Sequence, residues 1–107
     1  MRRGRIKEAK QAVREARQAA SDDDWAAAEA AVRRWLSARL ERRGAGAALS
    51  PLEASDVLAE HGAPLELGAE LGRLLGRIEA ARYGGGTTSG LAGALADWLD
   101  TAQKEWR

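Results

Sequence analysis

Few side chains in this sequence are of the types that catalyse reactions or bind metal ions. His61 is the only histidine and cysteine is absent, so disulfides and thiolate sites are excluded and nothing completes a zinc site. The acidic triplet at residues 22–24 lacks the spacing of a calcium-binding loop, and we interpret it as the start of a helix. His61 precedes a glycine, which is typical of a helix end. These residues predict no enzyme, no metal and no cofactor.

The glycine run at residues 84–86, followed by Thr-Thr-Ser, is the remaining candidate for chemistry, because glycine-rich loops can bind phosphate. A Walker-type loop needs a lysine before its last Ser or Thr, and none occurs between Arg82 and Lys104. A dinucleotide fingerprint needs a preceding strand, whereas the leucines of residues 67–81 have helical spacing. We therefore interpret the run as a break between helices, with anion binding at the next helix start as the alternative.

The composition predicts an all-α fold. Of the 107 residues 45% are hydrophobic, and the sequence has no Phe and a single Tyr, which favours helices over strands. This length suits one domain, which we divide into a basic N-terminal helix (residues 1–20) and a helical core (residues 21–107). No stretch approaches the roughly 18 consecutive apolar residues of a membrane span.

Apolar residues at spacings of three and four predict a single bundle of five helices. The first helix covers about Arg3 to Ala19, and the second runs from near Trp25 to the segment ERRGAGAA. The third runs from Ser50-Pro51 to His61-Gly62, and the fourth runs from Pro64 to just before Tyr83. The fifth begins after TTS and reaches Trp106. The first two could form a tetratricopeptide-like hairpin, although no second copy occurs at a 34-residue period, so a repeat array is excluded.

The third helix has the clearest start signal. We expect Ser50 as the N-cap, Pro51 as the first helical residue and Glu53 as the acid that completes a capping box. In that helix Leu52 would face the core.

Three further local expectations concern helix ends. Gly44 suits a left-handed cap for the second helix, and the side chain of Thr88 or Ser89 would cap the fifth. The ring of Tyr83 is expected to pack on the bundle.

A row of glycines lies along the fourth helix at Gly68, Gly72 and Gly76. Each costs about 1 kcal/mol relative to alanine in a helix interior, so a close neighbour should offset the loss. The neighbour is either another helix of this domain or a helix of a partner. In the second case the flanking Arg73 and Arg77 would join the glycines as partner-binding residues.

The first helix is strongly basic. Residues 1–20 carry a net charge of +5, whereas residues 21–107 carry −4. Such a helix is a solvated charged face, a membrane-proximal segment with Arg2, Arg3, Arg5 and Lys7 toward lipid head groups, or a nucleic-acid contact. The acidic remainder of the chain would repel a duplex, which disfavours nucleic acid.

Several landmarks resemble a known family. The segments DWAAAEAAVRRWLSARL, LSPLEASDVLAEHGAP and LGRLLGRIEAARYGGG, followed by an amphipathic helix, resemble the C-terminal cytoplasmic region of BatD-type aerotolerance proteins. The matching positions are Trp35-Leu36, Leu49-Ser50-Pro51, Gly62 and Arg82-Tyr83-Gly84.

The resemblance implies a non-enzymatic interaction module on the cytoplasmic side of the bacterial inner membrane, preceded by a membrane span that lies outside this sequence. It also implies protein partners, namely a MoxR-type AAA+ ATPase and proteins with von Willebrand factor A-type domains, in stress tolerance. The alternative is a small helical nucleic-acid-binding domain that uses the basic N-terminal helix.

Overall fold

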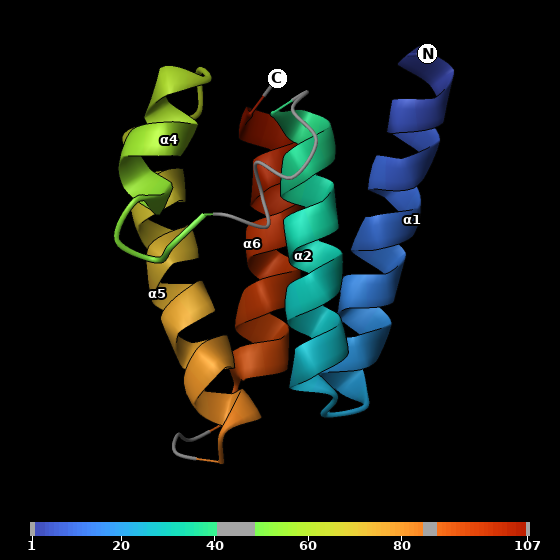
Figure 1. Ribbon diagram of the computed structural model, residues 1–107, viewed down its shortest axis with the longest axis vertical. Helices are drawn as coiled ribbons and strands as arrows, with labels where there is room; N and C mark the ends of the chain where they lie inside the picture. The colour runs from blue at the N-terminus through green and yellow to red at the C-terminus, as the bar shows by residue number, and fades with distance from the viewer. Residues whose placement is uncertain (1, 41–48, 85–87, 107) are drawn as a thin grey trace. The chain divides into compact units, whose positions relative to one another are not determined.

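The computed structural model describes residues 2–40, 49–84 and 88–106, with side chains from Lys7 onward. Within these ranges the secondary structure consists of helices and contains no strand, which confirms the all-α class (Figure 1). The described residues form five helices: α1 (Arg2–Ser21), α2 (Trp25–Arg39), α4 (Ala54–Glu60), α5 (Leu65–Arg82) and α6 (Leu91–Glu105). They belong to two compact units, Met1–Leu49 and Ser50–Arg107. Across the described ranges, none of the helices combines the length and apolar character needed to cross a bilayer.

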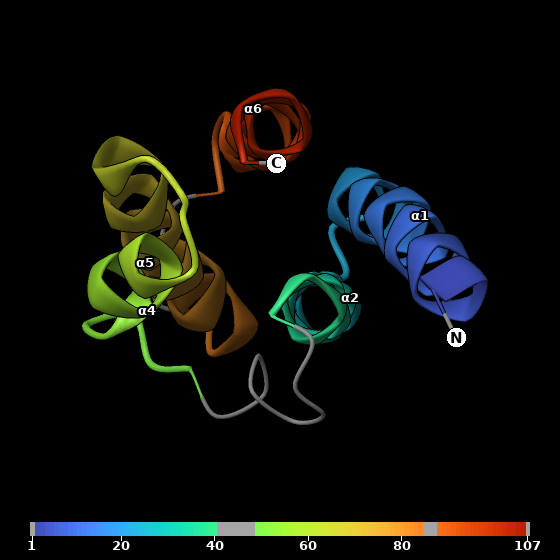
Figure 2. The same cartoon turned by 90° about the horizontal axis from the view of Figure 1, so that it is seen from above.

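Unit 1 is a helical hairpin in which α1 packs along α2 (Figure 2). The turn between them is built from the acidic triplet, as expected. The Asp24 side chain accepts a hydrogen bond from the Ala27 backbone N–H at 3.2 Å and caps α2. Asp23 has a positive φ of 61° and accepts a hydrogen bond from the Trp25 indole Nε1 at 2.7 Å. Local polar chemistry therefore fixes both the turn and the first residue of α2.

Small residues dominate the buried side of α1, whereas α2 buries larger ones. Ala12, Val13, Ala16 and Ala20 of α1 are buried, as are Trp25, Ala28, Ala31, Val32, Trp35 and Leu36 of α2. The alanines allow the two helix backbones to approach closely. Helix α2 ends at Arg39, and the expected cap at Gly44 lies outside the described residues.

Unit 2 contains the other three helices, with α5 packed against both α4 and α6. Helix α4 ends at the expected place, where His61 is the C-cap and Gly62 has a φ of +86°. Pro64 then precedes the first residue of α5, as the sequence predicts. The apolar faces of α5 and α6 are buried as expected, with Leu67, Leu71, Leu74, Leu75 and Ile78 on α5 and Leu91, Leu95, Trp98, Leu99 and Ala102 on α6.

The start of the third predicted helix differs from the expectation. Ser50 Oγ accepts from the Glu53 N–H at 3.3 Å, which is one contact of the expected capping box. The Glu53 carboxylate, however, accepts from the Ser50 hydroxyl at 2.7 Å rather than from the Ser50 backbone N–H. However, residues 51–53 form a turn, and α4 begins at Ala54. Because this turn is not helical, Leu52 does not face the core and is 94% exposed.

Two expectations near the start of α6 are wrong. The N-cap residue of α6 is Gly90, in the left-handed conformation at φ 72°, rather than Thr88 or Ser89. The Thr88 carbonyl instead accepts from the Leu91 N–H at 3.0 Å. Tyr83 does not pack on the bundle but is 76% exposed, with the Arg82 guanidinium 5.6 Å from its ring centroid.

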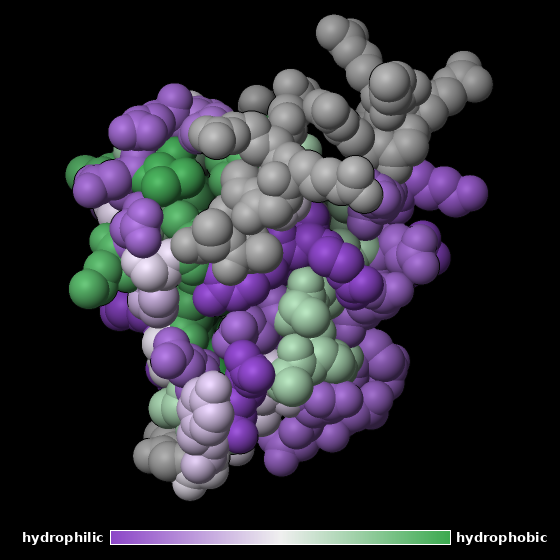
Figure 3. Space-filling view, viewed as in Figure 1, coloured by the Kyte–Doolittle hydropathy of each residue, from purple (hydrophilic) through white to green (hydrophobic). Residues whose placement is uncertain are grey.

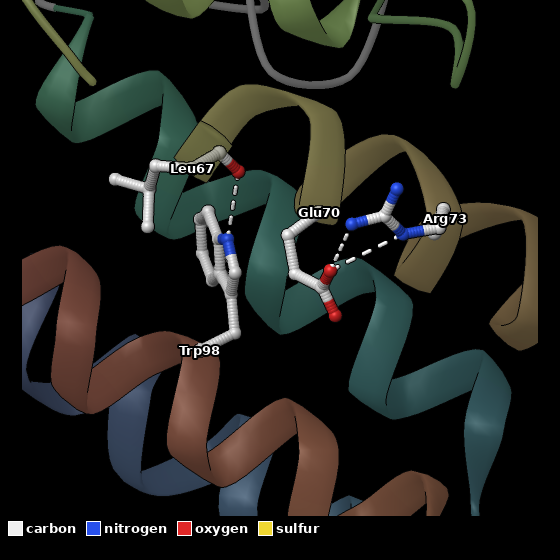
Figure 4. A network of polar contacts seen from close by, with 4 residues as sticks. All are labelled: Leu67, Glu70, Arg73 and Trp98. Carbon is white, nitrogen blue, oxygen red and sulfur yellow. Dashed lines mark hydrogen bonds and ion pairs between the residues drawn. The ribbon is translucent and has the colours of Figure 1, made fainter. Parts of the chain in front are cut away.

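Two tryptophans fasten α6 to the rest of unit 2. The Trp98 indole Nε1 donates to the Leu67 carbonyl in the first turn of α5 at 2.9 Å (Figure 4). The Trp106 indole Nε1 donates to the His61 carbonyl, between α4 and α5, at 3.0 Å. Both rings are buried, so each indole N–H finds the partner that burial requires.

Candidate interaction surfaces

The backbone of residues 51–55 covers two positions of the glycine row. A Cβ atom at Gly68 would lie 2.8 Å from Ser55 Cα and 3.1 Å from the Ala54 carbonyl oxygen. A Cβ atom at Gly72 would lie 2.6 Å from the Pro51 carbonyl oxygen. For these two glycines a segment of this chain is therefore a close neighbour, as one of the two alternatives expects, and their part in partner binding stays a prediction.

The other members of the row are arranged differently. Gly76 is exposed, and a Cβ atom there would have no neighbour within 4 Å. Arg73 forms an ion pair with Glu70 one turn earlier on α5 (Figure 4). Arg77 donates to the Ser89 carbonyl at 3.1 Å, which links α5 to the segment before α6. Partner binding by Gly76, Arg73 and Arg77 stays a prediction.

A further candidate, which the sequence did not indicate, is the exposed surface of α4, by which we mean α4 with Leu52 and Glu53 before it and Leu65 after it. Leu52 precedes α4 and is 94% exposed, and Leu65 follows it and is 67% exposed. Figure 3 shows hydrophobic side chains gathered over this part of unit 2, beside hydrophilic ones. The exposed acids Glu53, Asp56 and Glu60 follow at spacings of three and four along the same segment. One signal in the sequence could have indicated that Leu52 is exposed. The pair Ser50-Pro51 is typical of a helix start, but it is equally typical of a turn that precedes a helix.

The basic N-terminal helix is helical as expected, since α1 includes Arg2, Arg3 and Arg5. The side chains of these three arginines lie outside the described part of the structure, so their contact with lipid head groups stays a prediction. Lys7 is exposed. The structure adds Lys10, Arg14 and Arg17, which are exposed on the same helix, and an open hollow is lined by Arg14, Glu15, Arg17 and Gln18.

The arginines of α2 contact groups of unit 1. Arg33 pairs with Glu29 at 3.2 Å and donates to the Leu49 carbonyl, and Arg34 pairs with Glu15 of α1. The Arg39 guanidinium lies 5.9 Å from the Trp35 ring centroid, and burial lowers the pKa of Arg39 from its ordinary value. These cations stabilise the hairpin by packing and pairing.

His61 has a structural position. Its ring Nδ1 lies 2.9 Å from the Val57 carbonyl oxygen, and its own carbonyl accepts from Trp106. The imidazole therefore satisfies a carbonyl at the end of α4, as a capping residue does. Of the glycine run, Gly84 has a φ of +72° and ends α5, while residues 85–87 lie outside the description.

Comparison with known protein families, curated proteins and solved structures finds no match to this chain. The resemblance to BatD-type proteins therefore stays a prediction that rests on the residues quoted for it.

Proposed function

We propose that this chain is a non-enzymatic protein-interaction module and that the exposed surface of α4 is its contact site. The observation that carries the proposal is the exposure of Leu52, in the turn before α4, and of Leu65, the first residue of α5. They are two of the three large hydrophobic residues that stand exposed in the described part of the chain; the third is Tyr83. Large apolar side chains that gather on a surface mark sites of association.

Burial energetics support this use of the surface. Covering a leucine side chain fully is worth about 1.5–3 kcal/mol relative to leaving it in water. Leu52 and Leu65 together could therefore provide a substantial part of a binding free energy, before the cost of association is subtracted. They would form the apolar centre of a contact whose border is polar, as in other protein interfaces.

The acids beside these leucines indicate the chemistry of the partner. Glu53, Asp56 and Glu60 are exposed, and unit 2 as a whole has a net charge of −4. A complementary surface would present apolar side chains flanked by Lys or Arg. Such charges would increase the association rate and select the partner, while the leucines would contribute most of the affinity.

The resemblance to BatD-type proteins supplies the first partners to test. We propose a MoxR-type AAA+ ATPase and proteins with von Willebrand factor A-type domains, in a membrane-anchored stress or aerotolerance system on the cytoplasmic side. In this proposal α4 contacts one of these proteins, and the chain itself carries out no reaction.

The test is calorimetric titration of the purified chain with each candidate partner. The double variant Leu52→Ser/Leu65→Ser should weaken binding at least about tenfold, because two buried contacts are lost. Tyr83→Ser is the matched control, since it removes an exposed apolar side chain elsewhere on unit 2. Equal affinity of the double variant and the parent, or an equal loss in the control, would refute the α4 site. Absence of binding to every candidate would refute the proposed partners.

A further inference from the structure

A row of cations runs along the exposed side of α1. Lys7, Lys10, Arg14 and Arg17 are all exposed, at spacings of three, four and three residues. In an α-helix these spacings place the four side chains within an arc of about 80° around the axis and over a length of about 15 Å. We call these four residues the basic row.

Acidic groups do not neutralise most of this row. Within the described ranges Lys7, Lys10 and Arg14 form no ion pair, whereas Arg33, Arg34 and Arg73 each have a carboxylate partner. Glu15 is the nearest acid in sequence to Arg14. Its carboxylate is bound instead by Arg34 of α2 and by the Gln11 side-chain amide.

The acids of α1 lie on a different side of the helix. Glu8 and Glu15 are rotated by about 130° from the centre of the basic row. A flat anionic surface on the row would meet Glu15 only at its edge, where Glu15 lines an open hollow with Arg14 and Arg17 and its carboxylate is bound by Arg34. The major groove of a duplex is about 12 Å wide, and a helix that lies in it has phosphates on both sides. One of the two lines of phosphates would then face Glu8 and Glu15, so a duplex fits this helix less well than a flat surface does.

We propose that the basic row binds the anionic head groups of a lipid bilayer and lays α1 along its surface. The row is straight and one-sided, as a flat surface of negative charge requires. This inference does not depend on the proposed function, because it concerns a different unit and a different class of partner.

The binding is electrostatic, without insertion into the acyl layer. The apolar side of α1 is committed to the hairpin, where Ala12, Val13, Ala16 and Ala20 are buried. An interfacial helix that penetrates lipid needs a free apolar face. Attraction to lipid charge alone is screened by salt, with a Debye length of about 10 Å at 0.1 M ionic strength.

The experiment measures co-sedimentation of the full chain with vesicles of phosphatidylcholine containing about one third phosphatidylglycerol, against vesicles of phosphatidylcholine alone. The parent chain should bind the anionic vesicles only, and raising the salt from about 0.05 M to about 0.5 M should release it. Lys10→Gln/Arg14→Gln should weaken binding about 25-fold, since each basic residue near the surface contributes about fivefold.

The matched control removes two cations from α5. Arg73→Gln/Arg82→Gln changes the net charge by the same amount but keeps the basic row, and it should bind like the parent. An equal loss in both double variants would show that net charge rather than the row is responsible, and would overturn the proposal. So would equal binding to both vesicle types, no binding to anionic vesicles at low salt, or tighter binding to a duplex oligonucleotide that depends on Lys10 and Arg14.

Discussion

Alanine substitutions at Gly68 and Gly76 should change stability in opposite directions, although both glycines lie on one helix. In a helix interior, replacing glycine with alanine gains about 1 kcal/mol from propensity. At Gly76 the new methyl group would have open space, so the full gain is expected. At Gly68 the same methyl group would meet the backbone of α4.

The size of the conflict at Gly68 follows from the distances. The Cβ atom would lie 2.8 Å from Ser55 Cα and 3.1 Å from two carbonyl oxygens. Carbon atoms in contact prefer about 3.5–4.0 Å, so α4 would have to retreat by about 0.7 Å or more. Backbone atoms cannot rotate away as a side chain can. Overpacking of this kind costs about 1–3 kcal/mol, and a rigid neighbour suggests the upper part of that range. After the gain from propensity, Gly68→Ala should lose about 2 kcal/mol.

The assay is urea and thermal unfolding of the isolated chain, followed by circular dichroism and tryptophan fluorescence. The two variants should differ by about 3 kcal/mol, which corresponds to at least about 10 °C in Tm for a chain of this size. Trp98 is a local probe, because its indole bonds the carbonyl of the residue before Gly68. If Gly68→Ala proves as stable as Gly76→Ala, the close approach of α4 to α5 is refuted, and the alternative of a partner helix over these glycines is favoured.

Two other substitutions test the hydrogen bonds that fix the helices. Asp24→Ala removes the N-cap of α2 and should lower the free energy of unfolding in urea by about 1 kcal/mol. The control Asp22→Ala should lower it by less than about half as much. Equal losses in the two variants would refute the capping role of Asp24. Trp98→Phe keeps an aromatic ring but removes the donor to the Leu67 carbonyl, so it should lower the free energy of unfolding by about 1–3 kcal/mol. A change below about 0.5 kcal/mol in thermal unfolding would show that this hydrogen bond does not hold α6 to α5.

Local chemistry made much of the fold predictable from the sequence. Asp24 caps a helix by contacting a residue three positions later, and Gly62 supplies the left-handed conformation that ends α4. The leucine spacing of α5 predicts its buried side because a helix repeats every 3.6 residues. In each case the cause lies within a few residues of its effect.

The position of Leu52 was predicted wrongly because a non-local contact determines it. Leu52 was expected to face the core, but the backbone of its turn packs on α5 through the Pro51 carbonyl, which leaves the leucine outside. The row that contains Gly68 predicts a close neighbour without saying which one. The basic row was only partly predicted, because only the structure shows that Glu15 turns toward Arg34.

The indole hydrogen bonds of Trp98 and Trp106 join residues that are far apart in the sequence, so long loops must close before unit 2 is fully folded. Trp98 bonds a carbonyl 31 residues earlier in the sequence and Trp106 one 45 residues earlier, whereas α1 and α2 meet across the short turn at residues 22–24. Closing a long loop loses chain entropy before any contact compensates for it. We therefore expect the hairpin of unit 1 to form early during folding and the docking of α6 to be the late step, which refolding followed by tryptophan fluorescence would resolve.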